Sequence, residues 1–151
     1  MGDMLASGEL AAAIGVDGTA PDVKPLLPNG LEAGLAALRQ GGHYPINHLV
    51  VIKDELLAKY PDLAADVFDA FARAKRHYVE RLKAGRIEKP SGVDEVHRRV
   101  MDIIGEPLPY GIAPNRNVID QLIGHALTQG IITKPVTADE LFAPSTRALA
   151  G

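Results

Sequence analysis

The sequence predicts an α/β fold that is rich in helices and has few strands of its own. Two observations support this prediction. Apolar runs of strand type occur at residues 10–14 and 46–52, and several longer stretches repeat apolar residues at the three- and four-residue spacing of an amphipathic helix. The chain has 151 residues, which gives room for about one domain with a sizeable core.

The first predicted elements are short. Residues 10–14 (LAAAI) are followed by Gly15 and a turn, which indicates a buried strand or a helix end. Three closely spaced prolines exclude a helix between residues 21 and 28. Residues 31–40 are good helix formers, and Gly41 is expected to end that helix because glycine readily adopts the left-handed conformation of a helix terminus.

The second strand-type run is INHLVVI, at residues 46–52. Its β-branched, continuously apolar character predicts a strand that is buried on both faces. Two isolated strands do not make a stable sheet, because an independent sheet generally needs three or more strands or helix cover. We therefore expect a homo-oligomer in which the strands pair, or a longer protein of which this chain is a part.

Helices are predicted to dominate from Lys53 onward. A long helix carries one apolar stripe, formed by Leu63, Val67, Phe71, Ala74, Tyr78 and Leu82. Its basic residues lie mostly off that stripe and are expected to form a solvated face or, alternatively, an anion-facing surface; they are Arg73, Lys75, Arg76, Arg81 and Lys83. Further helices are predicted at residues 94–104 and 118–127, and a last helical turn at Thr137, where Glu140 completes a capping box.

Composition excludes several classes of protein. The formal net charge is −3 and no Lys/Arg-rich run occurs, so nucleic acid is not an expected partner. No apolar run approaches the ~20 residues needed to span a bilayer, so membrane insertion is not expected. The first basic residue is Lys24, which predicts a cytoplasmic location, or a periplasmic one if an upstream signal peptide exists. The absence of Cys excludes disulfides and thiolate nucleophiles.

Four stretches together carry a family resemblance: GELAAAI, the segment HYPINHLVVIKDELLAKYPDLAADVFDAFARAKRHYVERL, the segment GEPLPYGIAPNRNVIDQLIGHALTQGII, and DELFAPST. Over nearly its whole length the chain resembles the C-terminal half of 4,5-dihydroxyphthalate decarboxylase-like proteins, which share the two-lobed fold of type II periplasmic solute-binding proteins. The resemblance is strongest in HYPINH and LPYGIAPNR. One departure is Ala11, where family members often carry an acidic residue.

The resemblance implies a helix-rich C-terminal portion of that two-lobed fold. Residues 1–42 would be the end of the second lobe and the crossing segment, and residues 43–151 would be the strand re-entering the first lobe and the C-terminal helices. Tyr44, Asn47 and His48 would then gather at a strand end facing the cleft between the lobes, where open α/β sheets bind ligands.

Two residues are candidates for catalysis. His48 is either a core or hinge histidine bonded to the backbone, or a proton donor or carboxylate binder, since histidine titrates near neutral pH. Tyr110 is fixed between Pro109 and Gly111, and it is either an aromatic lid over the core or a phenol that donates to a substrate oxygen. His43 lies in a glycine-rich loop and is expected to be exposed.

Asn115 and Arg116 are candidates for substrate binding because they precede a helix, where free backbone N–H groups attract anions and a guanidinium can bind a carboxylate. The alternative is a helix cap followed by a surface arginine. The other histidines show no spacing that would build a metal site, so we expect neither metal nor cofactor.

The resemblance implies a decarboxylase that acts on a hydroxylated aromatic dicarboxylate, here as a partial chain. In that reaction His48 would be the acid, Tyr110 would bind a ring hydroxyl and Arg116 would hold the remaining carboxylate. The expected partner is thus a small aromatic carboxylate. The alternative is a solute-binding protein of an ABC-type transporter, which would recognise a similar ligand without catalysis, because a fold does not fix a function.

Overall fold

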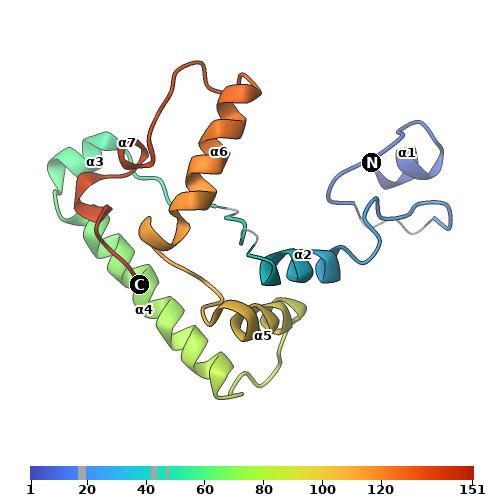
Figure 1. The fold of residues 1–151 in the computed structure, drawn as a ribbon, viewed down its shortest axis with the longest axis horizontal. Helices are drawn as coiled ribbons and strands as arrows, with labels where there is room; N and C mark the ends of the chain where they lie inside the picture. Colours follow the sequence, from blue (N-terminus) through green and yellow to red (C-terminus); the bar gives the residue numbers. More distant parts are fainter. Residues whose placement is uncertain (17–19, 42–43, 47) are drawn as a thin grey trace. The chain divides into compact units, whose positions relative to one another are not determined.

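The computed structural model describes residues 1–16, 20–41, 44–46 and 48–151, and in these residues it is built from helices joined by loops (Figure 1). In chain order the elements are α1 (Gly2–Ala6), α2 (Gly30–Arg39), α3 (Asp54–Lys59), α4 (Leu63–Lys83), α5 (Gly92–Ile104), the 3-10 turn η1 (Ala113–Asn115), α6 (Arg116–Thr128), α7 (Ala138–Leu141) and the 3-10 turn η2 (Pro144–Thr146).

The chain divides into two compact units, Met1–Ala36 and Ala37–Gly151. The first unit contains α1 and most of α2. The second contains α3 to α7 and all the cavities described below. The predicted division into residues 1–42 and 43–151 is based on the two lobes of the periplasmic solute-binding fold. This division stays a prediction.

Helix α4 is the longest of the described helices of the second unit, and it contacts α3, α5 and η2. Helix α6 contacts η1 and α7. The most deeply buried large residues are Leu82 on α4, Val100 on α5 and Pro107 in the loop after α5. A separate buried cluster joins Ile112, Ile119 and Ala138, with Ile46, Ile123 and Phe142 packed against it. The loop that carries Tyr110 runs between these two regions of the core.

The α/β prediction is wrong. Among the described residues the structure contains no sheet, and its β-type pairing is an isolated antiparallel bridge between Gly111 and Ala150. Residues 10–14 and the described part of 46–52 have no strand partner. They are also largely exposed: Ile14 is 97% exposed and Val51 is 90% exposed. An apolar β-branched run favours extended backbone, but only a neighbouring strand makes it part of a sheet.

The predicted helices are confirmed, and Gly41, which is expected to end the first of them, has φ of 80°. Gly105, with φ of 78°, ends α5, and Gly130, with φ of 68°, follows α6. Thr137 begins α7 with the predicted capping box: its hydroxyl accepts from the Glu140 backbone N–H, and Glu140 accepts from the Thr137 backbone N–H. These signals are local in sequence, so they do not depend on the missing sheet.

The predicted buried stripe of α4 is partly wrong. The buried residues of this helix are Ala64, Ala72, Val79 and Leu82. Of the residues in the predicted stripe, Leu82 is buried whereas Phe71 is 49% exposed. The buried face of α4 therefore differs from the predicted stripe and carries smaller residues, among them Ala64 and Ala72. Among the described residues, no helix is both long enough and apolar enough to cross a membrane.

Candidate functional site

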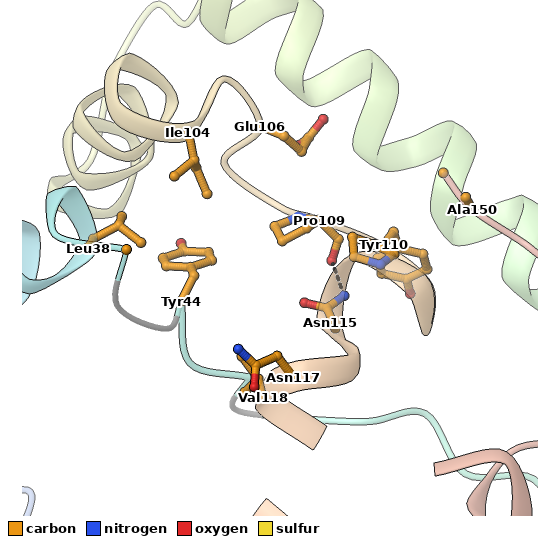
Figure 2. Close-up of a pocket in the computed structure, with 13 residues that line it drawn as sticks. Leu38, Tyr44, Ile104, Glu106, Pro109, Tyr110, Asn115, Asn117, Val118 and Ala150 are labelled. Atoms are coloured by element: carbon orange, nitrogen blue, oxygen red, sulfur yellow. Dashed lines mark hydrogen bonds between the residues drawn. The ribbon is translucent and has the colours of Figure 1, made fainter. Parts of the chain in front are cut away.

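A cavity of about 560 Å³ lies in the second unit, between the end of α5, the loop after it and the start of α6 (Figure 2). Leu38 and Ile104 supply apolar side chains at one side, and Pro109 and Val118 supply others. Its polar side chains are those of Tyr44, Glu106, Tyr110, Asn115 and Asn117. This combination of an apolar wall and a few polar groups is typical of a small-molecule site.

Asn115 fixes the loop that lines this cavity. Its side chain is buried, and its Nδ2 donates to the carbonyl of Pro109 at 2.9 Å and to the carbonyl of Gly111 at 2.8 Å. Both amide hydrogens are thereby used. Asn115 occupies the N-cap position of α6, as the helix-cap alternative expects, but its side chain makes no capping hydrogen bond to that helix. Asn115 therefore holds the backbone on both sides of Tyr110, and of its side-chain polar atoms Oδ1 is left to meet a ligand.

Two phenols face the cavity from different segments. Tyr44 belongs to the stretch after α2, and Figure 2 shows it on the side of Leu38 and Ile104, whereas Tyr110 lies beyond Pro109. Tyr110 packs at 5.3 Å, ring centre to ring centre, against Phe68 of α4. Burial raises the pKa of Tyr44 and that of Tyr110. Both phenols therefore keep their protons at neutral pH and can donate hydrogen bonds.

A second groove, of about 630 Å³ and more enclosed than the first cavity, runs along residues 48–52 and beside α4 and α7. It is mostly apolar, with Phe68, Phe71 and Phe142 in its wall. His48 lies on this groove and is exposed. Tyr110 and Asn115 line the groove as well as the smaller cavity, so they form a partition between the two.

The structure thus brings together some of the predicted residues and separates others. Tyr44, Tyr110 and Asn115 line the smaller cavity, whereas His48 lines the groove. Arg116 lines neither: its Nη2 lies 2.7 Å from Asp139 Oδ1, on a surface that joins α6 to α7. That hydrogen bond raises the pKa of Arg116 and lowers the pKa of Asp139.

Two predicted positions, His43 and Asn47, lie outside the described residues. Among the residues that are described, no group of three or more His, Asp or Glu side chains lies where it could hold a metal ion. The expectation that the protein needs neither metal nor cofactor stays a prediction.

Sequence reasoning missed Lys75. The helix pattern predicts a solvated or anion-facing position for Lys75, but its side chain is only 8% exposed and its Nζ lies 3.3 Å from Glu106 Oε2. The signal was present in the spacing, because position 75 lies three residues after Ala72 and four before Val79, and both are buried. A lysine on a buried helix face needs such a partner.

A second polar cluster, away from the cavity wall, joins α4 to α5. The Tyr78 hydroxyl donates to Asp94 Oδ1 at 2.8 Å and lies 2.8 Å from His97 Nδ1. Asp94 also accepts from Ser91 in the capping box of α5. Burial and the Asp94 hydrogen bond raise the pKa of Tyr78 to about 12. These hydrogen bonds hold α4 and α5 together where the two helices meet.

The chain is distantly similar to a 4,5-dihydroxyphthalate decarboxylase. It is 26% identical to that protein of Comamonas testosteroni over 153 aligned positions, which cover 95% of this chain and 46% of the decarboxylase. The chain thus spans about half the length of the curated relative it matches. No family model matches the chain, and no solved structure matches it.

Proposed function

We propose that this chain contributes to the decarboxylation of a hydroxylated aromatic dicarboxylate of the 4,5-dihydroxyphthalate type. The observation that carries this proposal is the similarity to the 4,5-dihydroxyphthalate decarboxylase, which extends over 95% of the chain. The cavity supports it, because its apolar wall suits an aromatic ring and its two phenols suit the oxygen atoms of such a ring.

Decarboxylation of such a ring involves three events in the substrate. The ring carbon that carries the leaving carboxylate receives a proton, the hydroxyl para to it supplies electrons to the ring, and the C–C bond breaks to release CO₂. Groups that position the ring favour this step, and the para hydroxyl supplies electrons best when it donates its own hydrogen bond to an acceptor. The oxygen atoms of Tyr44 and Tyr110 can accept such a bond, because a phenol is both a donor and an acceptor.

The roles predicted for His48 and Arg116 remain proposals, and the structure makes them harder to combine. His48 lies on the groove and Arg116 is engaged by Asp139, so neither lines the wall on which Tyr44 lies. Tyr110 lines both the groove and the cavity. An aromatic ligand that packs against Tyr110 is therefore within reach of residues in the groove and of residues in the cavity. The alternative of a transporter's solute-binding protein rested on the two-lobed fold, which the described residues do not form.

The proposal is tested by incubating the purified chain with 4,5-dihydroxyphthalate and trapping released CO₂, with phthalate as the substrate that lacks the electron-donating hydroxyls. We expect CO₂ from the first compound and none from the second. Tyr44→Phe should lower the rate on the order of tenfold, since it removes a hydrogen bond to a charged or polarised oxygen. Tyr60→Phe is the matched control, because Tyr60 is exposed and lines neither cavity. Absence of both CO₂ release and ligand binding by the chain would contradict the proposal.

A further inference from the structure

Residues 48–52 expose a continuous row of apolar side chains. Leu49, Val50 and Val51 are 53%, 56% and 90% exposed. They follow one another in the sequence and lie along the groove beside α4 and α7. Single exposed hydrophobic residues are common on protein surfaces, but a contiguous apolar stretch usually marks a contact with another molecule.

The backbone of the same residues is also unpaired. Within the part of the chain that the structure describes, no N–H or C=O group of residues 48–52 makes a hydrogen bond to another backbone group. No bend or turn interrupts residues 48–53, and Lys53 has an extended conformation, with φ of −65° and ψ of 137°. A segment with free backbone groups and β-branched side chains is a template for pairing with a strand of another chain.

The other run of strand type, residues 10–14, is less suited to such pairing. Its backbone bends at residues 11 and 14, and three of its five residues are alanine, which is depleted in strands. The sequence predicts a homo-oligomer in which strands pair, and these differences favour residues 48–53 over residues 10–14 as the place of contact.

The segment is complementary to itself when two copies run antiparallel. If Val51 lies opposite Val51 of the second copy, then Val50 lies opposite Ile52, and His48 lies opposite Asp54. The centre of the contact is then apolar. At each end an imidazole faces a carboxylate, to which it can donate a hydrogen bond.

A shift of the pairing by one residue loses this match. In one direction His48 comes to lie opposite Lys53, which removes its carboxylate partner and brings two basic groups together. In the other direction Asp54 lies opposite Leu49, which places a carboxylate against an apolar side chain. In the matched register Lys53 lies opposite Leu49 instead, and its methylene groups can cover that side chain while the ammonium stays in water.

We propose that residues 48–53 form an antiparallel contact with the same residues of a second copy of this chain, with Val51 at the twofold axis. The partner is a second copy because the segment's apolar centre and its charged ends match each other, as an isologous interface requires. The contact covers the exposed apolar row and gives the free backbone groups partners. It also places Asp54 of the second copy beside His48, which lines the groove. The proposal does not depend on the proposed function.

Light scattering over a range of chain concentrations measures this assembly, and we expect the mass to rise from one chain to two. Val51→Lys should raise the dissociation constant of the dimer on the order of a hundredfold, because each of the two copies loses a buried valine side chain. Ile14→Lys is the matched control, since Ile14 is 97% exposed and lies outside the contact. Circular dichroism verifies that each variant stays helical.

Single cysteines test the register, because the chain contains no cysteine of its own. Val51→Cys places two thiols opposite each other, within the Cα separation of about 4.4–6.8 Å that a disulfide needs. Leu49→Cys separates its two thiols by four residues, or roughly 13 Å along the strands. Mild oxidation should therefore link Val51→Cys chains into dimers and leave Leu49→Cys chains unlinked.

The mass of a single chain at every concentration would overturn the proposal and would indicate that no second copy covers residues 48–53. A dimer that is weakened equally by Val51→Lys and by Ile14→Lys would contradict the assigned surface. Equal cross-linking of the Val51→Cys and Leu49→Cys chains would contradict the antiparallel register with Val51 at its centre.

Discussion

Replacement of Asn115 by Ala is expected to destabilise the second unit and to disturb the loop that carries Tyr110. Asn115 is 7% exposed, and its amide group is the donor for two backbone carbonyls, those of Pro109 and Gly111. The loop contains two prolines and a glycine at positions 107, 109 and 111, and it has little regular backbone pairing of its own. The side chain of Asn115 therefore supplies hydrogen bonds that secondary structure supplies elsewhere.

The expected size of the effect follows from those two bonds, at 2.9 Å and 2.8 Å. Each contributes about 1 kcal/mol net, and the buried carbonyls left without a donor add to the loss, so the free energy of unfolding should fall by about 2–3 kcal/mol. For a chain of this size, that corresponds to a decrease in Tm of roughly 4–12 °C.

Thermal unfolding followed by circular dichroism measures this decrease, and urea unfolding gives the free energy. Asn117→Ala is the matched control, because Asn117 lies two residues further on and is exposed; its effect should stay within about 0.5 kcal/mol. Asn115→Asp should be at least as harmful as Asn115→Ala at neutral pH, because it places a carboxylate against two carbonyl oxygens. If Asn115→Ala costs no more than Asn117→Ala, the argument that this side chain holds the loop is refuted.

Three further outcomes are expected. The pKa of Asp94 is lowered to about 2 from 3.8, chiefly by the backbone hydrogen bond from Ser91. The contribution of Asp94 to stability should therefore be complete above pH 3.8 and lost as the pH falls through 2. Asp94→Asn should flatten this part of the acid-unfolding profile. Gly111→Ala should lower stability by roughly 1–3 kcal/mol in urea unfolding, whereas Gly124→Ala should not lower it. His48→Ala should reduce the rate of CO₂ release ~10²–10⁴-fold without loss of helicity if His48 is the proton donor; an unchanged rate would exclude that role.

The helices could be predicted from the sequence because their signals are local. Thr137 with Glu140 satisfies backbone groups within one helical turn, and Gly41, with φ of 80°, adopts the left-handed conformation expected after residues 31–40. Such features operate whatever the rest of the chain does. The strand prediction for residues 46–52 failed for the opposite reason, since a sheet requires partners that no local pattern can guarantee.

The candidate site was predictable only in part. The sequence pointed to Tyr44, Tyr110 and Asn115, and all three line one cavity. It did not reveal that the amide of Asn115 is used by the loop, that Arg116 is held by Asp139, or that Lys75 reaches Glu106 and Gly151. The contacts of Arg116 and Lys75 join remote segments whose proximity depends on packing, and the periodicity of a single helix carries no information about its neighbours. The bonds of Asn115 are local, but they depend on the conformation of an irregular loop, which has no periodic sequence pattern.

The measurement that tests the central claim most directly is proton NMR of the reaction of 4,5-dihydroxyphthalate with this chain in D₂O. Decarboxylation by protonation of the ring predicts a dihydroxybenzoate with one deuterium, located at the carbon that lost its carboxylate. The signals of the other ring hydrogens should be retained in full, and Tyr44→Phe should slow the appearance of this product more than Tyr60→Phe does. An unchanged spectrum of 4,5-dihydroxyphthalate at high chain concentration, with no change in line width that would indicate binding, would contradict the claim.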